Sequence, residues 1–219
     1  MAFNAQVLRN ASFQIQTALG SDITITGITN ASEAVITASN SLSNDDLVVL
    51  SGVVGMPKLN GRVVRVSSVS GTEFTAKGLD TTLTTYWGTY GSGGVGNEVS
   101  GFSAFTTVTG IDVPDGSPDE IDLTTIDADS KQIAFGHDAI IKGTVSVFAD
   151  PALAATTELI LAARLRTPRV FKLVTQSGGI YIFNATNVSG GSGFSGNLSS
   201  AATQTINVTL AYPMQGFVS

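Results

Sequence analysis

Seven carboxylates lie within residues 112–129, a segment that contains no lysine or arginine: Asp112, Asp115, Asp119, Glu120, Asp122, Asp127 and Asp129. Closely spaced carboxylates can bind a metal ion or act as a general acid and base. They can also form the solvated face of a segment that contacts a partner. The residues around these seven carboxylates decide whether the segment is a metal site, an acid–base site or a solvated contact face.

The stretch at residues 127–132, DADSKQ, opens like a calcium-binding loop. Such a loop needs glycine at its sixth position and glutamate at its twelfth, where this chain has Gln132 and Asp138. A glycosidase would also use paired carboxylates, but sugar sites are usually lined by aromatic side chains, and none lies between Asp112 and Ile133. The segment therefore predicts neither a calcium site nor a glycosidase site.

Other catalytic or cofactor-binding patterns are equally weak. The single histidine, His137, excludes a multi-histidine metal site, and its AFGHDA context predicts a turn histidine more readily than a catalytic base. The absence of cysteine excludes a thiolate nucleophile or ligand. Two G-x-G-x-x-G matches, at residues 91–96 and 191–196, are not followed by a predicted helix, so loops are expected there. We predict no catalytic residues, metal or cofactor, and hence no enzyme.

The composition favours a protein that is covered by other copies. Charged residues make up 13% of the 219 residues, whereas an ordinary soluble domain has roughly 25%. A weakly charged surface gives poor protection against self-association, so a polymer subunit is indicated. The net charge of −6 argues against tight binding of nucleic acid. The sequence shows neither a secretion signal nor a membrane-spanning apolar run, so no membrane partner is expected.

Residues 22–94 consist of short β-branched runs separated by turn residues, a pattern typical of strands. The pairs Asn60-Gly61 and Ser70-Gly71 predict tight turns. Residues 23–96 are therefore interpreted as a small all-β module.

After residue 100 the pattern predicts a sheet with one helix. Strands are expected in FTTVTGIDV, in AIIKGTVSVFA (with Val145 and Val147 on one face) and in RVFKLVT, IYIFNATNV and TQTINVTLAY. The helix is predicted in DPALAATTELILAARLRTP, with Asp150 as its N-cap and Pro151 in its first turn. Its packed face is predicted to carry Leu153, Ile160 and Ala163, with Thr156 close by.

Two longer stretches carry a family resemblance. FTTVTGIDVPDGSPDEIDLTTIDADSKQIAFG, followed after the helix by FKLVTQSGGIYIFNATN, resembles the tail tube protein of long, flexible-tailed (siphovirus-type) bacteriophages over residues 1–22 and 100–219. The stretch from ITGITNASEAVITA to YGSGG is similar to the first catalytic cysteine half-domain of ubiquitin-activating enzymes, which recurs as an insertion in phage tail proteins. The enzyme's cysteine chemistry does not carry over, because the chain has no cysteine.

The resemblance implies a mainly-β fold: a tail-tube β-sandwich or barrel with one α-helix packed outside, plus a small inserted β-barrel-like domain. The tube domain is expected at residues 1–22 and 97–219 and the insertion at residues 23–96. The subunit would form stacked, hexameric rings that make a conduit for genome DNA, which passes without tight binding. Implied partners are further copies, a tape measure protein, and tail terminator and tail tip proteins. The implied location is the virion tail, reached from the host cytoplasm.

Within that reading, we predict that the acidic segment is an extended arm that helps to hold neighbouring subunits. Its candidate interface residues are Asp115, Asp119, Glu120, Asp122, Asp127 and Asp129, with Arg164, Arg166, Arg169 and Lys172 as candidate partners. A solvated loop without a partner is the alternative for the segment. For the whole chain, the alternative is a monomeric two-module β-protein that binds carbohydrate or a cell surface.

Overall fold

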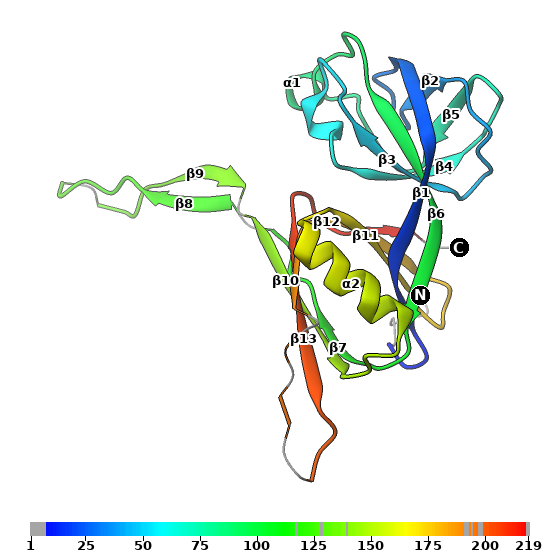
Figure 1. Cartoon of the computed structure of the whole chain (residues 1–219). Coiled ribbons are helices and arrows are strands. Elements are labelled where there is room, and N and C mark those ends of the chain that lie inside the picture. Colours follow the sequence, from blue (N-terminus) through cyan, green and yellow to red (C-terminus); the bar gives the residue numbers. More distant parts are fainter. Residues whose placement is uncertain are drawn as a thin grey trace.

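The protein consists of two lobes joined by a shared sheet, with a hairpin projecting to one side (Figure 1). The structure is a computed structural model that describes residues 8–116, 118–127, 129–138, 140–190, 193, 195–196 and 199–217, without the side chains of 118, 119, 135, 137 and 138. We call residues 23–96, at the top of Figure 1, the upper lobe, and the remaining described residues outside the hairpin the lower lobe.

Strands dominate both lobes, which confirms the predicted mainly-β class. The upper lobe contains the end of β1 (Ser12–Ile28), β2 (Val35–Ala38), β3 (Leu47–Ser51), the 3-10 turn η1 (Pro57–Leu59), β4 (Val63–Ser67), β5 (Glu73–Ala76), the short helix α1 (Thr84–Trp87) and the start of β6 (Val95–Phe105). Its sheet order is β2-β5-β4-β3-β6-β1. The β-branched runs therefore form strands as predicted, while α1 and η1, each shorter than five residues, were not foreseen.

The core of the upper lobe is built from alternate residues of these short strands. Ile36, Leu50 and Phe74 are fully buried in it. At the predicted Asn60-Gly61 turn, the Asn60 amide donates to the Val53 carbonyl and accepts from the Val53 N–H. Gly61 has a φ of 85°, which favours glycine. The turn thus anchors the end of β3 as well as reversing the chain.

The two lobes are connected by β1 and β6, which pair with each other along both lobes. The register runs from Phe13 opposite Phe105 in the lower lobe to Thr24 opposite Val95 in the upper lobe, with shifts between Gln16 and Asp22. Ile23 and Gly96, the predicted ends of the insertion, are direct partners in this ladder. The upper lobe therefore leaves and re-enters the lower lobe through one antiparallel pair of strands.

The lower lobe continues the sheet through β11, β12, β13, β10 and β7, with β14 pairing beside β12. The strands are β7 (Val108–Asp112), β10 (Ile141–Phe148), β11 (Arg169–Val174), β12 (Ile180–Gly190), β13 (Thr203–Leu210) and β14 (Gln215–Phe217). In β10, Val145 and Val147 are buried and Phe148 is exposed, as the alternating pattern predicts. The FTTVTGIDV run was predicted to be one strand, but β6 ends within it at Phe105 and a turn separates β6 from β7.

Helix α2 (Ala154–Leu165) packs across the lower lobe against β12, β1 and β6 (Figure 1). The prediction that Asp150 caps it is wrong, because the N-cap is Leu153 and the Asp150 carboxylate instead accepts from the Ala152 N–H in the preceding turn. The predicted face is also largely wrong. The buried residues are Ala155, Thr156, Leu159 and Ala162, so the stripe that faces the sheet lies beside the predicted stripe on the helix surface.

Beneath α2 the lower lobe has an aromatic core. The ring of Phe13 lies 5.4 Å from that of Phe171 and 5.7 Å from that of Phe105, and Phe171 stacks on Phe183 at 5.2 Å. These residues come from four adjacent strands, β6, β1, β11 and β12. Stacked rings at such distances add to the free energy of burial, so this cluster fixes the part of the sheet on which α2 lies.

Candidate assembly interface

The acidic segment forms a two-stranded hairpin that projects away from both lobes (Figure 1). Strand β8 (Pro118–Asp122) pairs with β9 (Ile133–Asp138), and the two form a sheet of their own. We call β8, β9 and the turn between them the arm. The predicted extended arm is therefore present as a hairpin, and His137, predicted to lie in a turn, falls within β9.

The arm's described carboxylates are exposed and bonded only locally. Asp122 accepts from the Thr124 N–H at 2.9 Å, and its pKa is lowered first by the Thr124 hydroxyl and then by this N–H. The pKa of Asp127 is lowered chiefly by the hydroxyl of Thr125. Both carboxylates are therefore negatively charged at neutral pH, and neither forms an ion pair with another described residue.

The remaining predicted carboxylates divide into three groups. Glu120 and Asp129 are exposed on the arm. Asp115 precedes β8 and accepts from the Gly116 N–H. The side chain of Asp119 lies outside the described residues.

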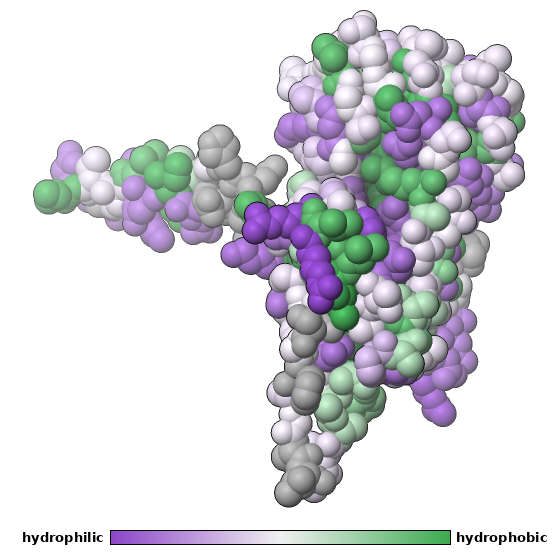
Figure 2. Space-filling model, in the orientation of Figure 1, coloured by the Kyte–Doolittle hydropathy of each residue, from purple (hydrophilic) through white to green (hydrophobic). Residues whose placement is uncertain are grey.

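Apolar side chains are also exposed on the arm. Ile121 is 48% exposed and Leu123 53%, while Ile126 at the tip is fully exposed and Ile133 lies on the opposite strand. Green apolar residues alternate with purple polar ones along the arm in Figure 2. An isolated two-stranded hairpin is marginally stable in water at best, and exposed apolar side chains favour burial against a partner. The arm thus has the character of a contact element.

The four predicted cationic partners are not equally available. Arg164 and Arg166 are exposed at the C-terminal end of α2. Arg169 is engaged within its own chain, since it lies 3.8 Å from Glu158 and donates to the Thr167 hydroxyl and the Pro168 carbonyl. Lys172 lies over the ring of Phe102 at 4.3 Å, and burial lowers its pKa.

Within one chain the structure does not bring the arm to these cations. The ion pairs between described residues join Arg65 to Asp45 and Arg169 to Glu158. The arm points outward from the lobes (Figure 1). Contacts between arm carboxylates and Arg164 or Arg166 would therefore have to come from another copy.

A second cationic feature, which the sequence did not reveal, lies where the lobes meet. The guanidinium of Arg62 lies between two rings, 4.2 Å from the centre of Tyr212 and 4.9 Å from that of Trp87. The ammonium of Lys58 lies 3.5 Å from the centre of the Tyr86 ring. The Lys58/Arg62 spacing and the adjacent Tyr86-Trp87 pair were weak local signals, but Tyr212 is 150 residues from Arg62 and only the fold brings it there.

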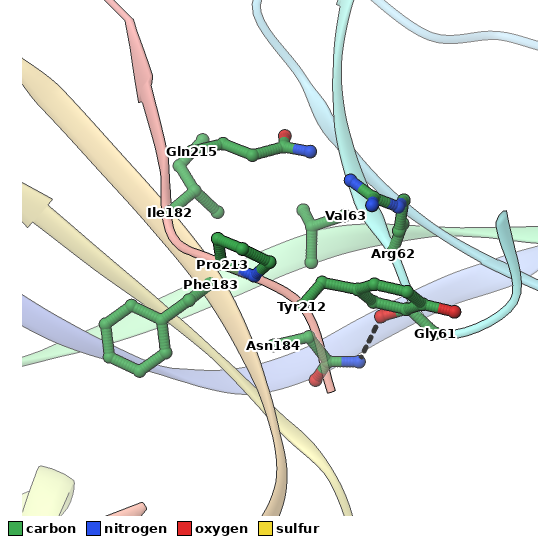
Figure 3. Close-up of a pocket in the computed structure, with 9 residues that line it drawn as sticks. All are labelled: Gly61, Arg62, Val63, Ile182, Phe183, Asn184, Tyr212, Pro213 and Gln215. Carbon is green, nitrogen blue, oxygen red and sulfur yellow. Dashed lines mark hydrogen bonds between the residues drawn. The ribbon is translucent and has the colours of Figure 1, made fainter. Parts of the chain in front are cut away.

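Hydrogen bonds across the junction hold this cluster in place (Figure 3). The amide of Asn184 on β12 donates to the Gly61 carbonyl at 2.8 Å. The hydroxyl of Tyr212 donates to the Asn60 carbonyl at 3.2 Å. Burial lowers the pKa of Arg62, whose Nε donates to the Lys58 carbonyl. Both lobes therefore contribute to one rigid cationic and aromatic surface.

Among the described residues, no group of three or more His, Cys, Asp or Glu side chains is placed to hold a metal ion. No helix in the described part of the chain has the length and apolar character needed to cross a bilayer.

Comparison with known proteins gives one family. The sequence model of the family described as "Phage tail tube protein, TTP" matches residues 54–212. The match covers the arm, α2 and most of the lower lobe, and it also includes residues 54–96 of the upper lobe. No curated protein matches the chain.

Proposed function

The chain belongs to the phage tail tube protein family, and from this premise we propose that it polymerises into stacked, hexameric rings that form the genome conduit of a flexible, siphovirus-type tail. Membership of the family makes it a structural protein of the virion tail. The ring, its symmetry and the conduit are the proposal. It follows that the protein works by assembly and not by catalysis.

The observation that carries the proposal is the arm. It projects from the lobes with exposed carboxylates and exposed isoleucines, and its two strands pair with each other but with no other strand of the described chain. Such an element gains stability when a second copy covers it. A monomeric protein would leave this surface in water.

The sheet supports the same conclusion. Strand β7, five residues long, pairs with β10 on one side and ends the sheet path on the other. Unpaired strand edges invite pairing with another chain, and a ring in which each subunit follows the next removes them. We propose that the β7 edge faces a neighbouring subunit in the ring.

We further propose that arm carboxylates guide one copy onto another through Arg164 and Arg166. These two remain exposed, whereas Arg169 and Lys172 already have contacts within the chain. Each exposed ion pair contributes about 0–1 kcal/mol. Their main effect is therefore on the rate and register of association.

The other partners follow from the resemblance to tail tube proteins. We propose that the tube forms around a tape measure protein and is bounded by tail terminator and tail tip proteins. Subunits are made in the host cytoplasm and remain in the virion tail. The upper lobe would project from the tube as an inserted module similar to the half-domain of ubiquitin-activating enzymes.

Negative-stain electron microscopy of the purified protein tests polymerisation directly. Rings or hollow tubes are expected, and a uniform monomer would instead favour the alternative of a β-protein that binds carbohydrate or a cell surface. The variant Glu120→Lys/Asp122→Lys should assemble more slowly while its circular dichroism stays unchanged. Adding Arg164→Glu/Arg166→Glu should restore part of the rate.

A matched control is available on the upper lobe. Asp80 accepts from the N–H and hydroxyl of Thr82, much as Asp122 is bonded to Thr124. The variant Glu73→Lys/Asp80→Lys makes the same change in net charge and should assemble normally. Equal slowing in both variants would show that net charge matters and the arm does not.

A further inference from the structure

A cavity of about 440 Å³ opens where the upper lobe, the lower lobe and the root of the arm meet. Lys58, Arg62 and Tyr86 line it from the upper lobe, and Tyr212 and Pro213 from the lower lobe. Gly116 and Ile141, which flank the arm on either side, complete its wall. It is thus a mixed cationic and apolar cavity at the base of the arm.

The two cations in this wall lack a partner of opposite charge. Neither Lys58 nor Arg62 is ion-paired with a described carboxylate. They lie against aromatic rings, and burial lowers the pKa of Arg62, so that water solvates its charge only partly. A partly desolvated cation binds a carboxylate more strongly than an exposed one does. The cavity is therefore suited to an anionic group next to an apolar one.

The distribution of charge over the chain points to a source for that group. Seven of the 17 acidic residues lie at residues 112–129, so the other ten face 11 lysines and arginines in the rest of the chain. The acidic segment therefore has a charge of −7, while the remainder has a charge of +1. The arm itself, residues 118–138, holds six of the acidic residues and one lysine, a charge of −5, while the rest of the chain has a charge of −1. Charge therefore favours contact between the arm of one copy and a cationic site on another.

The tip of the arm has the required chemistry. Ile126, fully exposed, is adjacent to Asp127, whose lowered pKa keeps it charged. The apolar part of the cavity, formed by Ile141, Ala211 and Pro213, can receive the isoleucine, and Lys58 and Arg62 can receive the carboxylate. The nine residue steps from Pro118 to Asp127, the first part of them in strand β8, place the tip at most about 30 Å from the root at roughly 3.3 Å per residue.

We infer that the tip of the arm, Ile126 and Asp127, inserts into the Lys58/Arg62 cavity at the arm root of a second copy. This inference rests on the proposed polymerisation and names its acceptor site. Because an extended hairpin holds its tip away from its own root, each chain supplies a tip to one neighbour and a cavity to another. A head-to-tail contact of this kind repeats without limit or closes into a ring.

Disulfide cross-linking tests the contact. Because the chain has no native cysteine, only the two introduced thiols can form a disulfide. In the full chain carrying Ala211→Cys and Ile126→Cys, which replace two side chains of the inferred apolar contact, mild oxidation should give a ladder of linked copies on a non-reducing gel, which collapses on reduction. A disulfide forms only when the two Cα atoms approach to within about 7 Å. The matched control, Lys77→Cys with Ile126→Cys, places the partner cysteine outside the cavity lining and should stay unlinked.

The other outcomes separate this contact from polymerisation itself. Tubes without a ladder would overturn the cavity as acceptor and leave the proposed function standing. A monomer without a ladder would overturn both. A disulfide within one chain would show that the arm folds back onto its own cavity, and would overturn the second copy as its occupant.

Charge reversal provides an independent readout that needs no cysteine. Lys58→Glu should slow the formation of polymer, followed by sedimentation over time, and adding Asp127→Lys should restore part of the rate. Lys77→Glu, with the same change in charge, should have no effect. If Lys58→Glu assembled like the unmodified protein, the inference would be wrong.

Discussion

If the upper lobe is an autonomous insertion, a cavity made in its core should weaken that lobe alone. Leu50 in the upper lobe and Leu210 in the lower lobe are both fully buried, each in the core cluster of its own lobe. Replacing a buried leucine by alanine costs about 2–5 kcal/mol. With a urea dependence of about 2 kcal/mol per molar, Leu50→Ala should lower the unfolding midpoint of its lobe by about 1–2.5 M.

The chain provides its own probe for this experiment. Trp87 is the only tryptophan, and it is buried in the core cluster of the upper lobe. Its fluorescence reports the upper lobe, while far-ultraviolet circular dichroism reports both lobes. Leu50→Ala should shift the fluorescence transition, and Leu210→Ala should shift the part of the dichroism transition that the fluorescence does not report, while leaving the fluorescence transition in place.

Cooperative unfolding of both lobes together would give a different and equally recognisable result. The lobes share β1 and β6 and are linked by the bonds from Asn184 and Tyr212, so they could unfold as one cooperative unit. In that case both variants would shift both signals by the same amount, and the insertion would not be autonomous. Ile36→Val, which costs about 0.5–1.5 kcal/mol, repeats the test if Leu50→Ala does not fold.

Three further predictions follow from the same structure. Because Asp22 and Asn97 are direct partners in the β1–β6 ladder, replacing residues 23–96 by an Asn-Gly turn should give a protein that still forms tubes in micrographs; soluble protein without tubes would place the upper lobe in the assembly interface. Because the net charge is −6, assembled tubes should not retain double-stranded DNA in filter binding at physiological salt; a sub-micromolar affinity would contradict this. Thr124→Val should raise the pKa of Asp122 measured by NMR, because it removes the largest cause of the lowering. The lowered pKa means that the turn is fully stabilised above the ordinary aspartate pKa and loses that stability as the pH falls through the lowered value, so in the variant the loss should be smaller and complete at a higher pH; an unchanged pKa would refute the role of the hydroxyl.

Local patterns in the sequence predict much of this fold. The alternation in β10 correctly identifies Val145 and Val147 as buried, because a strand with one face on a core repeats every two residues. The α2 region is correctly assigned as helix. Its packed face is not, because apolar residues such as Leu161 and Leu165 also lie on the exposed side of the helix, so the sequence pattern does not single out the face that contacts the sheet.

The candidate site is only partly predictable, for a physical reason. The acidic composition of residues 112–129 marks the arm, since a run of like charges cannot be buried in the lobe that carries it. The acceptor surface depends on Tyr212 reaching Arg62 across the junction, a contact set by the register between β12 and its neighbours. That register results from the packing of the whole sheet, and no local spacing encodes it.

The arm combines two kinds of contact that act at different stages of assembly. Its charge acts at a distance of about 10 Å at 0.1 M salt, which is far enough to guide an approaching copy but too weak and too easily screened to hold it. Its exposed isoleucines act only in contact, and their burial is insensitive to salt screening. At the inferred contact, the charged and the apolar interaction occur side by side. Asp127 and Ile126 are adjacent in the sequence. The cavity that would receive them has Lys58 and Arg62 in the same lining as Ile141 and Pro213. In the proposed assembly, charge would therefore set the rate and register of association, and apolar burial would hold the subunits together, as the proposed conduit for DNA requires.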